Sequence, residues 1–313
     1  MNECARYGLV VTVFLTFACS STSGTGSAVR GNGGSTGEGG SGIITGNGGS
    51  GIITGSGGNG IITGGGDSSG GADAGGATGM SCNGKLTGYI RDFLAAQSPD
   101  FEPFPPKPGD VVFPNRMPGK LDKNMIEPNI VDTMLGADKK PVYKLGDGTT
   151  SWTTTGSANF QTWFHDTDGI NKGQALDLQF TKDPTDPTGA TYKYDSAPNG
   201  FFPIDMQLLG NEGRTHNFSF TFEMHTRFTY VKGQTFHFRG DDDVWAFIDS
   251  KRVIDIGGIH DAFTQDVNLD TLGLTEGKEY PLDFFFAERH VYASDFLCET
   301  TIDFTNCGDV TVK

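Results

Sequence analysis

Three consecutive aspartates, Asp241, Asp242 and Asp243, are the residues of this sequence whose type and spacing most directly suggest chemistry. Adjacent carboxylates repel one another unless water surrounds them or a cation bridges them. Ca²⁺ takes about six to eight oxygen ligands, and clustered aspartates with backbone carbonyls are its usual protein environment. The triplet therefore predicts a calcium site.

The segments on either side of the triplet must position it, and both predict strands. Residues 236–239 alternate aromatic and polar side chains, which is typical of a half-buried strand. Residues 244–248 are apolar on both faces, as in a strand buried within a sandwich. A turn at 249–251 and a second strand at 253–256 then predict a hairpin. We expect Asp249 and Asp255 to be turn residues of this hairpin.

Two other polar groups fall near the ends of predicted strands. His260 follows two glycines and either contacts a ligand or caps a turn. Glu288, Arg289 and His290 form the second group. Arg289 also provides an alternative to the metal, because its guanidinium could pair with Asp242 in a salt-bridge network.

Catalysis has little support in the sequence. No GxSxG or comparable nucleophile turn is present. Two carboxylates for glycoside hydrolysis could be chosen from many acids, but any pair would be arbitrary. Two aromatic residues, Trp163 and Trp245, are able in principle to stack on sugar, but Trp245 lies in the middle of a predicted strand and is expected in the core. We therefore expect a binding protein and not an enzyme.

Glycine divides the chain into a linker and a domain. Of the 47 glycines, 25 lie within residues 20–80, where charged and large apolar residues are scarce. Such a segment cannot bury a core, which predicts a disordered, flexible linker. The motif GIITG recurs at Gly42, Gly51 and Gly60, but three copies without aspartate predict neither a calcium-binding roll nor a solenoid. Residues 81–313 are long enough for one β domain.

The first 19 residues predict export. Arg6 precedes an apolar run that is too short to span a bilayer as a helix, which is typical of a secretory signal peptide. Residues 15–19, LTFAC, resemble a bacterial lipobox, although Thr16 stands where leucine is usual. The resemblance implies that Cys19 is lipidated and that the glycine-rich segment tethers an outer-membrane or cell-surface domain.

Charge and cysteine content narrow the partners. The chain carries 38 acidic against 23 basic residues, a net charge of −15, which disfavours nucleic acid and anionic membrane. Membrane contact is then expected only through the lipid anchor. Cys82, Cys298 and Cys307 remain in the domain, and one disulfide is expected among them after export. Cys82–Cys307 would join the two ends of the domain, and Cys298–Cys307 is the competing local pair.

The domain itself reads as short strands with almost no helical periodicity. Prolines interrupt residues 98–130 and predict an irregular loop. Phe218, Phe220 and Phe222 alternate with polar residues, which predicts a half-buried strand. Further strand-like segments are expected at 149–155, 158–165, 175–181, 191–194, 226–230, 280–287 and 296–304. About ten strands at this spacing predict an all-β sandwich or barrel-like sandwich.

Several motifs, in order and spacing, resemble the fibro-slime domain, a relative of the PA14 and GLEYA adhesin β-sandwiches. They are LTGYIRDF from Leu86, PDFE from Pro99, FFPID from Phe201, HNFSFTFE from His216, GDDDVWAFID from Gly240, VIDIGGIH from Val253, the segment from Asn268 to His290, and DFLCETTI from Asp295. The resemblance covers nearly all of residues 86–304 and implies a PA14-like sandwich that begins with a strand at Leu86.

In the calcium-dependent PA14 adhesins, two adjacent aspartates joined by a cis peptide hold the ion, and a later loop completes the site. Asp241 and Asp242 match those aspartates, and residues 288–295 match the later loop. The adhesins typically present asparagine there, whereas this chain has Glu288, Arg289 and His290. The resemblance thus implies metal ligands at Asp241, Asp242, Asp243 and Glu288. It implies ligand contacts at Asp241, Asp242, His260, Glu288, Arg289 and His290.

These features predict a surface-anchored adhesion module that binds a glycan or an extracellular matrix polymer with the help of calcium. The alternative is a structural matrix protein that self-associates and uses the aspartates only to stabilise its fold.

Anchoring can be tested through Cys19. Replacing it (Cys19→Ala) removes the thiol that would carry the lipid, so the protein should move from the membrane fraction to the soluble fraction. Fractionation followed by immunoblotting measures this, and an unchanged distribution would remove the lipoprotein prediction.

Overall fold

The structure is a computed structural model that describes residues 82–102, 126–146 and 148–310. These residues belong to one compact unit, Gly70–Lys313. The predicted signal peptide, Cys19 and the glycine-rich repeat lie outside the described residues, as does most of the proline-rich segment. Within the described residues, no helix is long and apolar enough to cross a membrane.

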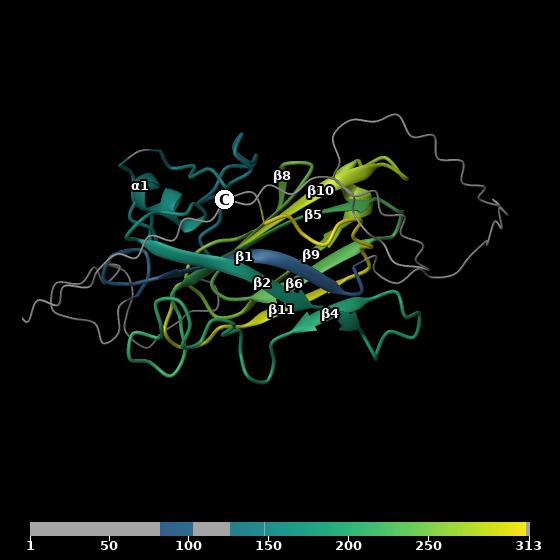
Figure 1. The fold of residues 1–313 in the computed structure, drawn as a ribbon. Coiled ribbons are helices and arrows are strands. Elements are labelled where there is room, and N and C mark those ends of the chain that lie inside the picture. The colour runs from purple at the N-terminus through teal and green to yellow at the C-terminus, as the bar shows by residue number, and fades with distance from the viewer. Residues whose placement is uncertain (1–81, 103–125, 147, 311–313) are drawn as a thin grey trace, which may run out of the picture. The chain divides into compact units, whose positions relative to one another are not determined.

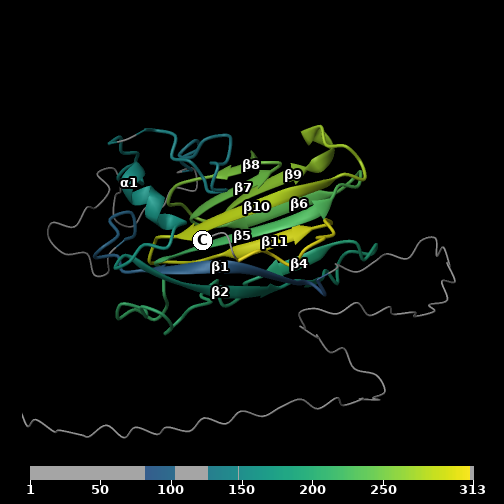
Figure 2. The same ribbon diagram turned by 45° about the horizontal axis from the view of Figure 1, so that its top comes forward.

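The described residues form two antiparallel sheets packed face to face, seen most clearly in Figure 2. The six-stranded sheet has the order β2-β1-β5-β10-β7-β8. Its strands are β1 (Lys85–Phe93), β2 (Asn171–Gln179), β5 (Phe220–Thr229), β7 (Asp243–Ile248), β8 (Lys251–Ile256) and β10 (Glu279–Glu288). The five-stranded sheet has the order β3-β4-β11-β6-β9. Its strands are β3 (Thr181–Lys182), β4 (Tyr192–Asp195), β6 (Thr235–Gly240), β9 (Phe263–Asn268) and β11 (Phe296–Thr300). The predicted all-β, PA14-like sandwich is thus confirmed.

Alternating aromatic and aliphatic side chains fill the space between the sheets. Phe222 and Phe286 come from the six-stranded sheet, and Phe238 and Phe296 from the five-stranded sheet; all belong to one buried cluster. The rings of Phe286 and Phe296 lie 5.4 Å apart across the interface. This is the core that the period-two patterns predict, because successive side chains of a strand point to opposite faces.

The outer face of the six-stranded sheet is also buried, beneath a cap formed by residues 126–146 and 148–170. The cap contains α1 (Ser157–Phe160), labelled at the left of Figure 1. The 3₁₀ helix η1 (Gln161–Trp163) follows it directly. A second apolar cluster joins Phe160, Trp163 and Phe164 of the cap to Trp245 and Phe285 of the sheet. The sheet is therefore covered on both faces where the cap lies.

The cap corrects two predictions. Residues 158–165 were expected to be a strand, but residues 158–163 are helical. Phe160, Trp163 and Phe164 are spaced three and four residues apart, which places all three on one helical face. The strand containing Phe220 and Phe222 was expected to be half-buried, but Thr221 and Glu223 on its other face are buried as well.

The hairpin after the aspartate triplet has its turn where predicted, at Asp249, but Asp255 is not a turn residue. Asp249 and Ser250, between β7 and β8, both have positive φ, 53° and 63°. This pairing is typical of a tight two-residue hairpin turn. Asp255 lies within β8, pairs with Arg252 at 2.9 Å and accepts a hydrogen bond from the Asn129 amide.

A disulfide joins the two ends of the described domain. Cys82 is bonded to Cys307, 225 positions later, while Cys298 is free and buried. The backbone continues the attachment, because the Thr87 amide donates to the Cys307 carbonyl. The C-terminal segment is therefore fixed beside the start of β1.

Candidate functional site

The aspartate triplet lies where the chain crosses from one sheet to the other. β6 belongs to the five-stranded sheet and β7 to the six-stranded sheet, so the acid loop (240–243) connects them. The segment 288–295 makes the reverse crossing, from β10 to β11. Ala287 is paired with Asp243, and Phe296 with Gly240, so the two crossings run side by side. A Cβ on Gly240 would lie 2.6 Å from the Asp295 carbonyl oxygen, so this close approach requires glycine.

Asp241 and Asp242 are joined by a cis peptide bond, as the resemblance implies. The Asp241 carboxylate accepts a hydrogen bond from the Asp295 amide. Asp242 Oδ1 accepts from the His260 amide at 3.2 Å, and Oδ2 accepts from the Arg289 amide at 3.0 Å. Backbone amides thus orient both carboxylates without contributing a formal positive charge.

Asp243 has a different environment, because it forms a buried ion pair with Arg289. Asp243 Oδ2 lies 2.6 Å from Arg289 Nε, and both side chains are fully buried. Asp243 Oδ1 accepts from the Gly258 amide at 2.6 Å. Both carboxylate oxygens of Asp243 are therefore engaged. The Arg289 side chain forms this salt bridge with Asp243, and the Arg289 backbone amide donates to Asp242.

The rest of the Arg289 guanidinium binds the cap and the adjoining loop. Nη1 donates to the carbonyls of Asp100 and Thr153, at 2.9 and 2.7 Å. The guanidinium also lies over the Trp163 ring, 4.5 Å from its centre. Burial opposes the charge of Arg289, but the neighbouring Asp243 carboxylate raises its pKa above the ordinary value. Arg289 is thus a structural cation that joins the acid loop to the cap.

Burial also shapes the electrostatics of Asp241 and Glu288. Burial and, to a smaller extent, the nearby Asp295 charge raise the pKa of Asp241 to about 7. Burial, together with the charges of Asp242 and Asp241, raises the pKa of Glu288 well above its ordinary value. Glu288 Oε1 accepts from the His290 amide. Two buried acids of this site, Asp241 and Glu288, therefore have pKa values above their ordinary ones.

The two histidines lie at the margins of this group. His260 is buried, which lowers its pKa to about 4, and its Nδ1 contacts the Asp261 carbonyl at 2.7 Å while Nε2 has no hydrogen-bond partner. His290 faces away from the acid loop, with Nε2 3.1 Å from Glu102 and its ring 4.7 Å from that of Tyr292.

The structure brings Asp241, Asp242 and Glu288 into one electrostatic group, with His260 beside it. It separates Asp243 and Arg289 into their own pair. Over the described parts of the chain, no three His, Cys, Asp or Glu side chains converge as a ready-made metal site. An ion bound here would need backbone carbonyls or water to complete its coordination.

A groove of about 610 Å³ opens beside the acid loop. Phe202 and His216 are stacked on one of its walls, with ring centres 4.0 Å apart, and Tyr292, 70% exposed, stands on another. Arg214 Nε, a buried polar atom of a lining residue, has no hydrogen-bond partner within the protein. Asp295 belongs to both places, because it lines the groove and its backbone amide and carbonyl both bond Asp241.

Sequence reasoning missed the groove. Its walls come from residues 198–202, 213–218 and 291–295, which are distant in sequence and lie mostly in turns. The motifs FFPID and HNFSF were recognised for fold alone. A cluster of aromatics in irregular sequence was the only available signal, and it does not reveal which segments meet. Trp163 and Trp245 are buried and therefore cannot serve as stacking platforms.

Comparison with known proteins agrees with this architecture. Residues 210–309 match the PA14 domain family. The chain is 37% identical to protein psiQ of Dictyostelium discoideum over 221 residues, which cover 66% of this chain and 21% of that protein. It is 35% identical to protein psiC of the same organism over 240 residues, 71% of this chain and 43% of that protein. The chain thus spans less than half the length of these curated relatives. They are eukaryotic, and the bacterial lipoprotein and fibro-slime assignments stay predictions.

The buried ion pair gives a stability prediction. Replacing Arg289 (Arg289→Met) leaves Asp243 charged and unpaired in the interior, which typically reduces the free energy of unfolding by about 3–5 kcal/mol. The matched control is Arg239→Met, because Arg239 pairs with Asp295 at 3.1 Å but is 42% exposed. An exposed pair is worth about 0–1 kcal/mol. Urea unfolding measures both, and equal losses would contradict the structural role of Arg289.

Proposed function

We propose that this chain, whose residues 210–309 match the PA14 domain, is a surface-anchored adhesion module that binds carbohydrate or a matrix polymer with the help of Ca²⁺. PA14 domains are typically carbohydrate-binding or adhesion modules. The observation that carries the proposal is that Asp295 lines a groove with aromatic walls and also donates its backbone amide to Asp241. The groove therefore lies directly beside the acid loop.

The groove has the composition that sugar binding needs. Sugar rings present apolar faces that pack on aromatic side chains, and hydroxyl groups that exchange hydrogen bonds with polar side chains. Tyr292 and the His216 ring supply aromatic surface. Arg214 Nε is a buried polar atom that lacks a hydrogen-bond partner within the protein. A polyhydroxylated ligand would satisfy a group that is costly to leave unpaired.

The acid loop fits a divalent ion in charge and donor type. Asp241 and Asp242 are adjacent carboxylates that accept hydrogen bonds from backbone amides, and Glu288 lies within the same electrostatic group. We propose Asp241 and Asp242 as the calcium ligands and Glu288 as an additional acid that strengthens the field. Asp243 is left out of this set, because Arg289 and the Gly258 amide occupy its oxygens.

The proposal also includes the anchor and excludes catalysis. Display at the outer membrane or cell surface would follow from lipidation of Cys19, with the glycine-rich segment as tether. A binding role is preferred to an enzymatic one because of the PA14 match and because the buried acids are oriented by backbone amides within the fold.

Calcium should stabilise the domain. Linkage predicts about 2.7 kcal/mol at a hundred times the dissociation constant, or a rise in melting temperature on the order of 5–10 °C for a domain of this size. Differential scanning fluorimetry in calcium and in EDTA measures the rise. Asp242→Asn should abolish it, whereas Asp243→Asn should lower the melting temperature in both buffers and leave the rise intact. Equal melting temperatures in calcium and EDTA would remove the metal from the proposal.

The calcium effect should depend on pH. The folded state raises the pKa of Asp241 from 3.8 to about 7, so burying this carboxyl destabilises the fold increasingly as pH rises from about 4 to 7. Calcium competes with the proton and offsets that loss. The calcium-induced rise should therefore be larger at pH 8 than at pH 5.5. A rise that is equal at both values would contradict binding at Asp241.

A glycan array tests the ligand. The domain should give a signal in calcium that EDTA and Asp242→Asn both abolish. Tyr292→Ala should weaken it, since Tyr292 is the exposed aromatic of the groove. Trp152→Ala is the matched control, because Trp152 is 59% exposed and does not line the groove. Concentration-dependent assembly with no glycan signal would favour the alternative, a self-associating matrix protein.

A further inference from the structure

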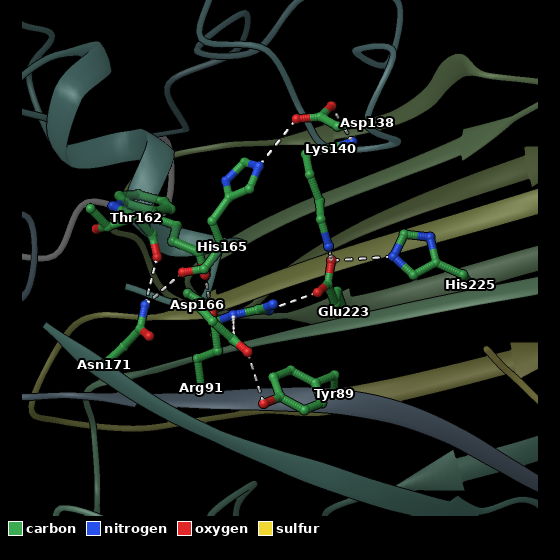
Figure 3. Close-up of polar contacts among 12 residues, drawn as sticks. Tyr89, Arg91, Asp138, Lys140, Thr162, His165, Asp166, Asn171, Glu223 and His225 are labelled. Atoms are coloured by element: carbon green, nitrogen blue, oxygen red, sulfur yellow. Dashed lines mark hydrogen bonds and ion pairs between the residues drawn. The ribbon is translucent and has the colours of Figure 1, made fainter. Parts of the chain in front are cut away.

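A second group of buried charges lies on the outer face of the six-stranded sheet, where the cap meets it (Figure 3). Arg91 comes from β1, Glu223 and His225 from β5, and Asp283 from β10. Lys140 comes from the cap and lies 2.5 Å from Glu223 Oε2. All five residues are less than 10% exposed. None of them belongs to the acid loop or to the groove.

The geometry around His225 specifies its protonation state. Its Nδ1 lies 2.8 Å from Asp283 Oδ1, and its Nε2 lies 3.2 Å from Glu223 Oε2. Ionised carboxylates only accept hydrogen bonds, and a neutral imidazole donates from one nitrogen only. Both contacts are satisfied together only when His225 is an imidazolium ion.

We propose that this group is a proton-dependent clasp. Protonated His225 holds Glu223 in position to receive Lys140, and so docks the Lys140 hairpin (131–143) on the sheet. Loss of the proton releases the tip of the hairpin.

The charged groups around His225 show what its deprotonation would change: one of its two hydrogen bonds to carboxylates would be lost. Glu223 is on its own strand, and Asp283 faces it from β10. Lys140 of the cap and Arg91 of β1 reach it only through Glu223, which Arg91 Nη1 contacts at 2.7 Å. A neutral His225 would turn a lone pair toward either Asp283 or Glu223. The buried Asp283 Oδ2 has no hydrogen-bond partner, so no other donor compensates.

The apolar and backbone neighbours of His225 do not titrate. The Phe285 ring packs edge-on against the imidazole, 5.5 Å between centres, and the Asp309 amide donates to the His225 carbonyl. Burial lowers the pKa of His225, but the contacts to Asp283 and Glu223 outweigh it and raise the pKa above the ordinary value. Because the pKa is raised on folding, the clasp is complete below about pH 6.5 and is lost as pH rises through the folded-state pKa.

Besides Lys140, backbone contacts that do not titrate hold the tip of the hairpin: Met134 forms a β-bridge with Lys251, and the Leu135 amide donates to the Ser250 carbonyl. Val131 and Tyr143 at the base are paired in a β-bridge and belong to the second apolar cluster, whose burial does not depend on pH. The tip residues from Asp132 to Lys139 are exposed or half-buried. A cavity of about 210 Å³ separates the hairpin from α1 and η1, so the tip has space beside it.

One other titrating contact reaches the tip. His165 Nε2 lies 3.1 Å from Asp138 Oδ2, as Figure 3 shows, but these side chains are 38% and 56% exposed. An exposed pair contributes little to docking. It provides the control for the test, because it titrates at the same hairpin without belonging to the buried group.

Hydrogen exchange read by mass spectrometry tests the clasp, in EDTA so that calcium plays no part. After correction for the intrinsic exchange rate, the peptide 131–143 should open on the order of tenfold more readily at pH 9 than at pH 6, which is the effect of one charge-assisted hydrogen bond. His225→Gln should show the higher opening at both pH values. His165→Gln should keep the pH dependence of the wild type.

Each outcome decides the proposal. A wild-type opening that does not change with pH, a pH dependence that survives His225→Gln, or one that His165→Gln abolishes would each overturn it. If His225→Gln does not fold, Lys140→Met provides the second test, since methionine retains the aliphatic length without the charge. Lys140→Met should raise opening at pH 6 to the wild-type value at pH 9, and unchanged protection at pH 6 would overturn the clasp.

Discussion

The rest of the structure depends on the burial of one cation, the Arg289 guanidinium. It pairs with Asp243 on the strand after the acid loop, donates to carbonyls of Asp100 and Thr153, and lies over Trp163. A guanidinium presents five donors in a fixed plane, so one side chain can fix three segments at once. A buried pair of this kind need not add net stability, but it penalises every arrangement that leaves either charge unpaired. The pair therefore specifies how the loop, the cap and the sheet meet.

The cap explains why so many charges are buried in a β-sandwich. An antiparallel sheet usually keeps one face in water, and its polar residues lie there. Here the cap covers that face, with apolar contacts around Trp245 and Phe285 at the centre. Glu223, which the alternating pattern places on the outer face, becomes buried together with its neighbours. Two cations from different elements, Arg91 and Lys140, pair with the buried Glu223 carboxylate and compensate its charge. A cap that covers this face of the sheet must therefore also supply partners for the charged side chains that it buries.

The sequence predicted what depends on local pattern. Strand alternation, the turn at Asp249 and the both-face burial of 244–248 follow from side-chain periodicity and turn chemistry, and all are present. The helical segment at 158–163 was misread as strand, because its apolar spacing is short and its helix is only one turn long. The burial of Glu223 could not be predicted, since nothing within β5 indicates that a distant segment covers it.

The candidate site shows the same division between local and long-range information. The sequence shows directly that Asp241 and Asp242 are adjacent, and the resemblance to the PA14 adhesins implied the cis peptide bond between them. The sequence did not indicate that Arg289 also pairs with Asp243, because neighbouring residues of a strand point in opposite directions and a shift of one position changes which carboxylate meets the guanidinium. The groove depends on three loops that are distant in sequence. No periodicity in those loops predicts their meeting.

The three aspartates have different environments because β7 begins at Asp243. Asp243 is its first residue, so its side chain points to the outer face and meets the cap, where Arg289 neutralises it. Asp241 and Asp242 precede the strand and are held by the amides of Asp295 and Arg289, which orient charge without cancelling it. A metal is unnecessary for the first of these environments, and it would relieve the electrostatic penalty of the second. The same three consecutive residues therefore provide one carboxylate paired with a guanidinium and two that backbone amides orient, and the start of β7 separates the two environments.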